Sequence, residues 1–249
     1  MKRTITHRPL VFAHRGAKQG APENTVPAFE AAIRMGADGI ELDVQYSSDG
    51  KLVIFHDLSL EKTSNGTGRV SAHTFEELRQ LDAGSHFDAA FAGTQIPTLD
   101  EALETAKGRL LVNIELKTVE IAQSNLGPDT VEAVRRHGMA NDVVISSFNP
   151  FALRKSKAAG PEIEHALLLA PDLAGWMRWG LTLRHSRADG LHPEKGMATA
   201  GYIAAARRRH LPVRVWTVND EADARRLAGL GVDALITDTP DIALAALAA

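Results

Sequence analysis

Residues 39–44 of this 249-residue chain read GIELDV. In an extended backbone, side chains two positions apart share a face, so Glu41 and Asp43 point to one side and the apolar residues between them to the other. Two neighbouring carboxylates without a counter-charge repel each other, and burial would push at least one of them towards protonation. A hard cation removes that repulsion. The stretch therefore predicts a strand with one apolar face and a cation site on the other.

Three other apolar runs also carry ionisable groups at their ends. They are AHRG at 13–16, VIFHD at 53–57 and NIELK at 113–117. In the last of these, Glu115 and Lys117 have the same two-residue spacing and so share a face of their strand. Together the four stretches predict one metal-centred pocket with two histidines, His14 and His56.

The composition limits the class of protein. With 44% hydrophobic residues the chain can bury a large core, and its length suits one α/β barrel over 1–249 rather than two domains. The formal net charge is only -3 and no long basic run occurs, which argues against a nucleic-acid partner. We interpret the three arginines at 207–209 as a solvated helix face.

The sequence contains no cysteine, which excludes disulfides, thiolate metal sites and a cysteine nucleophile. Any metal must then be held by oxygen or imidazole. The N-terminus is basic, but the apolar stretch at 10–13 is too short for a signal peptide, and no apolar run approaches the ~18 residues of a membrane span. We therefore expect a protein without stable membrane insertion, and the oxidising compartment is neither required nor excluded.

Apolar strand-like runs alternate with amphipathic stretches along the whole chain, which is typical of βα units and a parallel sheet. Nine strands are predicted, at 10–13, 39–44, 52–55, 110–116, 143–148, 164–169, 190–192, 213–218 and 234–237. Because a barrel needs eight, we interpret 45–51 as a hairpin turn about Asp49 and Gly50. Facing residues in that hairpin have numbers that sum to roughly 99, which places His56 beside Asp43. The predicted fold is an α/β protein, a (β/α)8 TIM barrel.

Start and stop signals mark the helices between the strands. Helices are predicted from Thr25 to Gly36, from Asn149 to near Gly160, from Asn219 to near Gly229 and from Thr239 onwards, and Thr98 begins a capping box. The stretch between His56 and that box has about forty residues, far beyond the usual βα loop of ~2–6. It carries its own helix start at Thr74. We therefore interpret 58–96 as a small insertion after the second strand, on the active face of the barrel.

The ionisable residues gather where barrel enzymes have their catalytic groups, at the C-terminal ends of strands. These residues are His14, Glu41, Asp43, Glu115 and Lys117. Three carboxylates without thiolates or clustered histidines favour one Mg²⁺, Ca²⁺ or Mn²⁺ ion over zinc, and the sequence does not choose among the three. Arg15 and Lys117 beside such a cation would form an anion site, for which phosphate is the obvious ligand.

Two imidazoles at a metal-bound phosphodiester can divide the proton transfers between them. One would remove a proton from the attacking hydroxyl, and the other would donate a proton to the departing alcohol. Meanwhile the cation would stabilise charge on the phosphoryl oxygens. The sequence thus favours phosphodiester chemistry.

Two polar residues near these motifs are given supporting roles. Asn24 precedes the first predicted helix, and we expect it to cap that helix rather than to touch the ligand. His192 ends a predicted strand, but no partner for it is visible in the sequence. We therefore expect it to lie behind the residues that contact the ligand.

Four aromatic side chains are the remaining candidates for contact with the substrate or with another subunit. Phe148 and Trp216 end two later strands, and they either pack against the carbon atoms of the substrate or belong to the core. Trp176 and Trp179 lie on a helix predicted over 172–180, where they cover the surface or a subunit contact. The question whether the chain forms a homo-oligomer therefore stays open.

The motifs together resemble those of the glycerophosphodiester phosphodiesterase family. They are HRG at 14–16, PENT at 22–25, ELDV at 41–44, HD at 56–57, ELK at 115–117 and WTVN at 216–219. Each motif is short, but the combination in this order is highly specific and extends over essentially the whole chain.

The resemblance implies a TIM-barrel hydrolase that cuts glycerophosphodiesters, such as glycerophosphocholine or glycerophosphoethanolamine, into sn-glycerol 3-phosphate and an alcohol. It also implies roles: Glu41, Asp43 and Glu115 bind the divalent metal, His14 and His56 form the acid–base pair, and Arg15 and Lys117 hold phosphate. In its compact size, modest insertion and missing signal peptide the chain is similar to the cytoplasmic bacterial members, and this similarity implies a cytoplasmic location.

A similarity to phosphatidylinositol-specific phospholipases, which share the barrel and the paired histidines, extends the mechanism. It implies that the glycerol 2-hydroxyl attacks phosphorus and gives a cyclic phosphate that water then opens. His14 is the expected base and His56 the expected acid of the first step.

Two other functions stay open. A lysophospholipid-cleaving, phospholipase D-type enzyme on the same barrel would need a wide apolar mouth. The insertion offers Phe75, Leu78, Phe87 and Phe91 for it but also carries many polar residues. A non-catalytic phosphate-binding barrel would not need two proton-transfer groups. The leading hypothesis is therefore a phosphodiesterase with a small water-soluble substrate.

Overall fold

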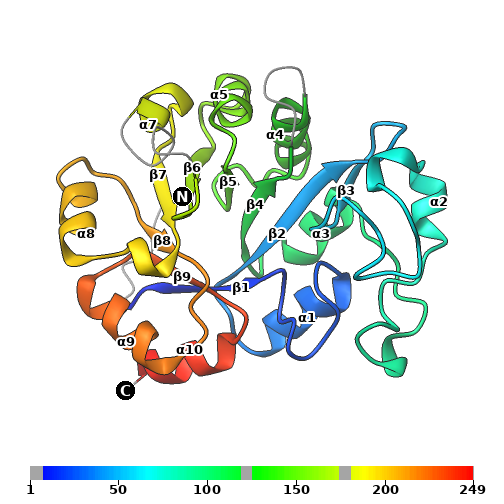
Figure 1. Ribbon diagram of the computed structural model, residues 1–249, viewed down its shortest axis with the longest axis horizontal. Coiled ribbons are helices and arrows are strands. Elements are labelled where there is room, and N and C mark those ends of the chain that lie inside the picture. Colours follow the sequence, from blue (N-terminus) through cyan, green and yellow to red (C-terminus); the bar gives the residue numbers. More distant parts are fainter. Residues whose placement is uncertain (1–7, 119–124, 174–180, 249) are drawn as a thin grey trace.

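The computed structural model of the chain describes residues 8–118, 125–173 and 181–248. In these residues nine strands form one sheet, namely β1 (Leu10–His14), β2 (Gly39–Tyr46), β3 (Leu52–Ile54), β4 (Leu111–Leu116), β5 (Val143–Ser147), β6 (Glu164–Leu169), β7 (Gly190–Pro193), β8 (Arg214–Val215) and β9 (Ala234–Thr237). Eight of them are parallel and follow the order β7-β6-β5-β4-β2-β1-β9-β8 around a barrel (Figure 1). Isolated bridges from Leu191 to Val213 and from Glu194 to Trp216 connect β7 with β8. The predicted TIM barrel is confirmed.

All but one of the described helices lie on the outer side of the barrel, and α2 lies in the segment that projects beyond β3 (Figure 1). The described helices are α1 (Val26–Arg34), α2 (Phe75–Arg79), α3 (Leu99–Ala106), α4 (Leu126–Arg136), α5 (Pro150–Ala159), α7 (Leu181–Ser186), α8 (Ala200–Arg207), α9 (Glu221–Leu230) and α10 (Pro240–Ala248). None of these described helices combines the length and the apolar character needed to cross a bilayer. Trp176 and Trp179, from the helix predicted over 172–180, lie outside the described residues.

Most of the helix start signals act as expected. Thr98 and Thr74 both form capping boxes, in which the side chain accepts a hydrogen bond from the backbone N–H three residues later. Helix α9 differs from the prediction at its start, because Asp220 rather than Asn219 caps it, whereas it ends at Leu230, near Gly229 as predicted. The amide of Asn219 is engaged elsewhere, in a contact with the last strand end that is described below.

The β2–β3 hairpin has a register one residue away from the prediction. Val44 pairs with Ile54, because the loop contains the three residues 48–50 rather than two. The last of these is a glycine with a φ of 80°, and the Ser47 N–H donates to the Lys51 carbonyl at 3.0 Å. A three-residue loop that ends in a left-handed glycine is a common hairpin connection.

Because of this register, Phe55 rather than His56 faces Asp43. The Phe55 N–H donates to the Asp43 carbonyl at 3.0 Å. The strand ends at Ile54, and the chain then turns so that His56 still comes close enough to Asp43 for their charges to interact. The predicted neighbourhood is therefore present, but through a turn and not through strand pairing.

The strand predicted at 213–218 is also shorter than expected. Regular pairing covers only Arg214–Val215, against β9. Beyond it, the Trp216 N–H donates to the Pro193 carbonyl at 3.2 Å and the Val218 N–H donates to the Ile236 carbonyl at 2.9 Å. The chain here bonds alternately to its two neighbours, which interrupts the ladder.

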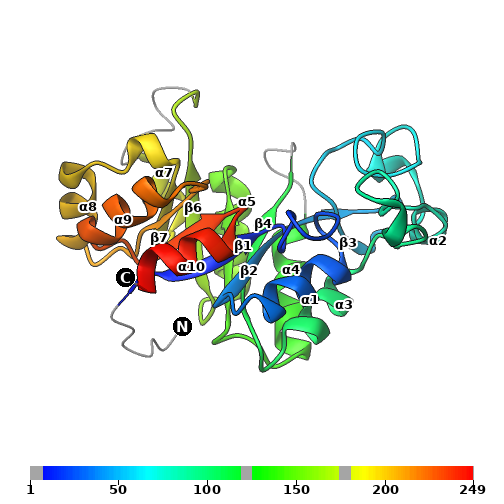
Figure 2. The same ribbon diagram turned by 90° about the horizontal axis from the view of Figure 1, so that it is seen from below.

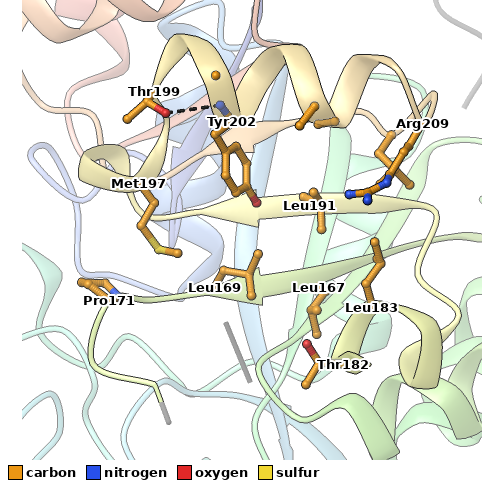
Figure 3. A pocket seen from close by; sticks show the side chains of 14 residues that line it. Leu167, Leu169, Pro171, Thr182, Leu183, Leu191, Met197, Thr199, Tyr202 and Arg209 are labelled. Atoms are coloured by element: carbon orange, nitrogen blue, oxygen red, sulfur yellow. Dashed lines mark hydrogen bonds between the residues drawn. The ribbon is translucent and has the colours of Figure 1, made fainter. Parts of the chain in front are cut away.

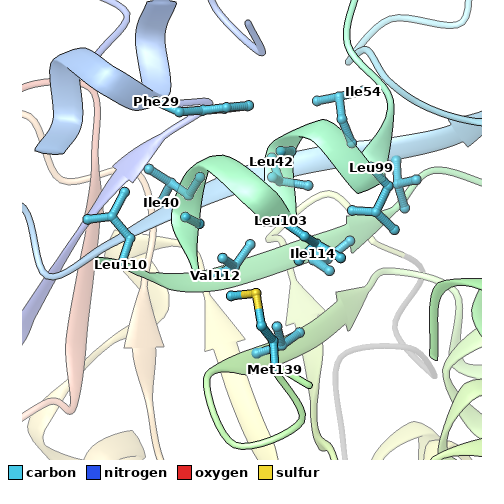
Figure 4. Packing of buried hydrophobic residues seen from close by; sticks show 14 of the residues in the cluster. Phe29, Ile40, Leu42, Ile54, Leu99, Leu103, Leu110, Val112, Ile114 and Met139 are labelled. Atoms are coloured by element: carbon cyan, nitrogen blue, oxygen red, sulfur yellow. The ribbon is translucent and has the colours of Figure 1, made fainter. Parts of the chain in front are cut away.

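The main core lies between the outer face of the sheet and the helices. Figure 4 shows Leu99 and Leu103 of α3 packed among Ile40 and Leu42 of β2 and Val112 and Ile114 of β4. These strand residues alternate with Glu41, Asp43 and Glu115, which face the inside of the barrel. Burial of the apolar face thus fixes the direction in which the carboxylates point.

The segment 58–96 contains α2 and two short 3₁₀ helices, η1 (Val70–Ala72) and η2 (Ala89–Phe91). From the side it projects beyond β2 and β3 (Figure 2). Its own buried cluster includes Leu60, Val70 and Leu78, which pack with Val53 and Phe55. The interpretation as an insertion in a single domain over 1–249 stays a prediction.

Candidate active site

Three carboxylates converge inside the barrel at its C-terminal end. Glu41 and Asp43 lie on β2, and Glu115 lies on β4 directly beside Asp43 in the parallel register. One carboxylate oxygen from each residue lies within 4.8 Å of the others. The structure therefore brings together the three acidic residues that the sequence singles out.

The protein charges only partly balance this cluster. Burial, together with the neighbouring Asp43, raises the pKa of Glu41 well above its usual value and that of Glu115 to about 7. Burial would also raise the pKa of Asp43, but Lys117, His56 and Arg15 outweigh it and lower that pKa. Full ionisation of all three carboxylates at neutral pH therefore calls for additional positive charge.

The donor set fits a hard divalent cation. All three groups offer carboxylate oxygens, and the buried Asp43 Oδ1 accepts no hydrogen bond in the described part of the chain. Such oxygens are the ligands that Mg²⁺, Ca²⁺ and Mn²⁺ prefer. A possible acidic metal site is thus present, and its geometry does not identify the metal.

Two cationic side chains border the carboxylates. Lys117 Nζ lies 2.9 Å from Glu115 Oε1 and 3.3 Å from Asp43 Oδ1. Arg15 donates from Nη1 to Glu23 Oε1 at 2.7 Å, and its buried Nε lies 3.6 Å from Asp43 Oδ2. Burial opposes the charge of both residues, but the surrounding carboxylates outweigh it and raise the pKa of each. Both cations therefore persist beside the carboxylate cluster.

His14 ends β1 and is held by a carboxylate from the last strand end. Its Nδ1 lies 2.6 Å from Asp238 Oδ1, while its Nε2 lies 3.8 Å from Glu41 Oε2. Burial lowers the pKa of His14 although the bond to Asp238 raises it. We assign the proton to Nδ1, because Asp238 is an ionised acceptor. The Nε2 lone pair then faces the carboxylate cluster.

Asp238 is itself fixed from two sides. Asn219 donates from Nδ2 to Asp238 Oδ2 at 2.8 Å and accepts from the Asp238 backbone N–H at 2.9 Å. Lys18 Nζ lies 2.8 Å from Asp238 Oδ1. The sequence analysis missed Asp238 and Lys18. The strand-end rule applied to β9 would have found Asp238, whereas Lys18 comes from a loop.

His56 has a similar carboxylate partner. Its Nδ1 lies 2.5 Å from Asp57 Oδ1. Burial lowers the pKa of His56, although nearby Asp43 raises it. The Gln45 side chain donates to the Phe55 carbonyl at 2.8 Å and to the Asp57 carbonyl at 2.9 Å. The amide of a β2 residue thus fixes the turn that presents His56.

A cavity of about 320 Å³ opens beside His56. Its lining includes Lys117, Glu115 and Phe148. Phe148 therefore borders the open space, which agrees with the first of its two predicted roles, packing against the substrate, rather than with the second, a place in the core. Trp216 does not line this cavity. Its ring packs edge-on against Phe148 with centroids 5.6 Å apart, and its Nε1 donates to the His192 carbonyl at 2.7 Å.

Two supporting residues have different outcomes. Asn24 is not a helix cap, and that prediction is wrong. Its φ is 56°, its Nδ2 donates to Asp43 Oδ2 at 2.8 Å, and its Oδ1 accepts from the Asp43 backbone N–H at 3.3 Å. A left-handed conformation suits asparagine and turns the amide to the site. His192 is fully buried, and neither ring nitrogen has a hydrogen-bond partner in the described residues.

Comparison with known proteins places this arrangement in a family. The sequence profile of the glycerophosphoryl diester phosphodiesterase family matches residues 14–242. The chain belongs to this family. It is 38% identical over 235 residues to a glycerophosphodiester phosphodiesterase of Caldanaerobacter subterraneus subsp. tengcongensis, covering 94% of this chain and 96% of that protein. The predicted family and enzyme class are confirmed.

Solved structures of the family have the same fold. A phosphodiesterase of Oleispira antarctica, in complex with the product sn-glycerol-3-phosphate, is 34% identical with a TM-score of 0.86, covering 97% of this chain and 98% of that one. A glycerophosphodiester phosphodiesterase of Agrobacterium tumefaciens is 34% identical with a TM-score of 0.82, covering 95% and 99%. The chain is thus similar to these enzymes over its whole barrel.

Proposed function

We propose that this enzyme hydrolyses glycerophosphodiesters, such as glycerophosphocholine or glycerophosphoethanolamine, to sn-glycerol 3-phosphate and an alcohol. The observation that carries the proposal is the convergence of three carboxylates, two cations and two histidines at one end of the barrel, in a chain of this family. The similarity to a phosphodiesterase in complex with sn-glycerol-3-phosphate supports the glycerophosphate half of the substrate.

Glu41, Asp43 and Glu115 would hold one Mg²⁺, Ca²⁺ or Mn²⁺ ion. When bound, the ion would supply positive charge that stabilises the phosphoryl oxygens as negative charge develops on them. Arg15 and Lys117 bind and orient the phosphate from the protein side. Arg15 is suited to this role because Glu23 holds its guanidinium at the edge of the carboxylate cluster, and the planar fork of an arginine matches two phosphate oxygens.

His14 is the base of the first step. Its Nδ1–H is engaged by Asp238, burial keeps the ring neutral, and Lys18 beside Asp238 further opposes its protonation. Its Nε2 takes the proton of the glycerol 2-hydroxyl, whose oxygen bonds to phosphorus. The result is a cyclic phosphate, as the bond from phosphorus to the alcohol oxygen breaks.

His56 is the acid of the same step. It donates a proton to the departing alcohol, which the cavity of about 320 Å³ beside it has room to receive. In the second step water opens the cyclic phosphate and the two histidines exchange roles. A substrate with hydrogen in place of the glycerol 2-hydroxyl is then expected to be inert, and normal turnover of that deoxy substrate would contradict the cyclic intermediate.

The acid–base assignment is tested by the release of sn-glycerol 3-phosphate from glycerophosphocholine. We expect His14→Ala and His56→Ala each to lower kcat by about 10²- to 10⁴-fold. His86→Ala, which changes an exposed histidine of the projecting segment, is the matched control and should keep wild-type turnover. Activity that survives both active-site substitutions would overturn the assignment.

A lysophospholipid substrate is less well supported than a small diester. None of the four apolar residues that the segment 58–96 offered lines the cavity beside His56. Leu78 is fully buried, Phe75 and Phe91 pack against hydrophobic clusters, and Phe87 is 39% exposed. We therefore favour water-soluble diesters and, with them, the cytoplasmic location expected from the sequence.

A further inference from the structure

A larger cavity of about 540 Å³ lies on the outer wall of the barrel, bounded by residues of β6, β7, α7 and α8 (Figure 3). Leu167, Leu169 and Leu191 point into it from the two strands. These residues alternate with positions such as His192 that face the inside of the barrel, so the sheet separates this cavity from the carboxylate cluster. Its volume falls in the range of roughly 300–1,000 Å³ that is usual for small-molecule sites.

The cavity has an apolar wall and one charged end. Among its described lining residues only Arg209 is ionised, and the guanidinium has no ion pair or hydrogen bond in the part of the chain that the structure describes. All three arginines at 207–209 are exposed, which fits the predicted solvated face, but their contacts differ. Arg207 donates to the Gly231 carbonyl at 2.8 Å, whereas Arg209 borders the cavity.

Tyr202 adds to the wall of the cavity from α8. Its ring extends from α8 towards the two strands, as Figure 3 shows, and its hydroxyl is enclosed without a hydrogen-bond partner among the described residues. Because this hydroxyl is enclosed, it does not face the open space, and Tyr202 contributes the apolar surface of its ring. The cavity therefore combines apolar surface with one cation.

We propose that this cavity binds a medium-chain fatty acid, with its carboxylate on Arg209 and its alkyl chain along Leu167, Leu169 and Leu191. A carboxylate matches the planar fork of a single arginine. A phosphate monoester would bring about two negative charges to one cation, and a neutral hydrocarbon would leave the guanidinium unused. The site is distinct from the phosphodiesterase site and does not depend on it.

The test is calorimetric titration of the full chain with decanoate and with 1-decanol, below the concentrations at which either aggregates. Decanoate should bind wild type about tenfold more tightly than the alcohol, because only the acid has a charge for Arg209. Arg209→Gln should remove that preference. Arg208→Gln, which changes the exposed neighbour that does not line the cavity, should leave it intact.

A cavity-filling variant locates the ligand. A Cβ added at Gly201 would meet no heavy atom within 4 Å, and Gly201 lines the cavity on α8, so Gly201→Leu can fill the space without a clash at its Cβ. We expect Gly201→Leu to lose binding of both ligands while its circular dichroism and its turnover of glycerophosphocholine stay at wild-type levels. Absence of decanoate binding to wild type, equal binding of acid and alcohol, or binding that Gly201→Leu does not change would each overturn the proposal.

Discussion

Asp238 at the end of β9 holds the Nδ1 atom of His14 at 2.6 Å. The contact bridges the first and last strands of the barrel, which pair in parallel from Leu10 with Ala234 to Ala13 with Thr237. The orientation of His14 therefore depends on correct pairing of the two chain ends. It also depends on a carboxylate that lies 224 residues away in the sequence.

Asp238→Asn removes the charged acceptor of the His14 Nδ1–H, and the ring can then turn or change tautomer. We expect kcat for glycerophosphocholine to fall by about 10²-fold or more, with a smaller change in KM, because the residue orients the base without touching the substrate. Steady-state kinetics measures both constants. Asp241→Asn, three residues on and exposed, serves as the control. Equal kcat in wild type and Asp238→Asn would contradict the positioning role.

Gly16 follows Arg15 in a tight turn against the first helix. Its φ is 80°, and a Cβ added there would lie 2.7 Å from the Ala28 Cβ and 2.8 Å from the Ala28 carbonyl carbon. Gly36 has a similar φ of 77° but nothing within 4 Å of an added Cβ. Gly36→Ala should thus lower the free energy of unfolding by about 1–2 kcal/mol from backbone strain alone.

Gly16→Ala adds the steric conflict to the same strain. We expect its cost to exceed that of Gly36→Ala by about 1–3 kcal/mol, since the α1 backbone must shift to make room. Urea denaturation of both variants gives the comparison. Similar losses of stability would show that the close approach to Ala28 is unimportant.

His165, which lies outside the active site, makes the free energy of unfolding depend on pH. It is fully buried, its Nε2 lies 2.8 Å from Ser156 Oγ, and burial lowers its pKa from 6.5 to about 4. Because the folded pKa is below the unfolded one, the stability it contributes is complete above pH 6.5 and is lost as the pH falls from there to about 4. The loss amounts to about 3 kcal/mol.

His165→Gln keeps a polar group beside Ser156 but does not titrate. The free energies of unfolding of wild type and His165→Gln should therefore converge as the pH is lowered from 7 to 4. Denaturation curves at several pH values measure the difference. A difference that is constant over this range would show that His165 is not the titrating group.

Asn24 stabilises Asp43 through its amide. Asn24→Asp keeps the shape and tolerates the left-handed conformation, but it replaces the donor to Asp43 Oδ2 with a like charge. We expect the concentration of Mg²⁺ or Mn²⁺ that gives half-maximal activity to rise by about 10- to 100-fold, because Asp43 loses its orienting partner. A lower metal requirement would instead indicate that the new carboxylate itself acts as a ligand.

Local patterns were sufficient to predict the barrel and the convergence of the carboxylates. Alternation along β2 and β4 fixes which side chains face inward, and parallel neighbours then place Asp43 beside Glu115. The same reasoning could not give the hairpin register, because one additional loop residue with a left-handed glycine shifts every pair. It also could not give the roles of Asn24 and Lys18, which lie on loops whose path depends on tertiary packing.

The partners of the histidines show a similar limit. Asp57 adjoins His56 in the sequence, and Asp238 ends a strand, so both were visible as candidates. The sequence does not show which of its acidic residues pairs with each histidine. Gln45 determines the first pairing, because its side chain fixes the turn at His56. Asn219 determines the second, because its amide donates to Asp238, and the capping of α9 is left to Asp220.

We propose that Glu41, Asp43 and Glu115 together hold one divalent cation that turnover requires. The most direct test is the release of sn-glycerol 3-phosphate from glycerophosphocholine by enzyme that has been stripped with a chelator and then supplied with Mg²⁺, Ca²⁺ or Mn²⁺ in turn. We expect loss of activity on stripping and recovery with at least one of these ions at one equivalent per chain, but no recovery in Glu41→Gln. Full turnover in the presence of the chelator would contradict it.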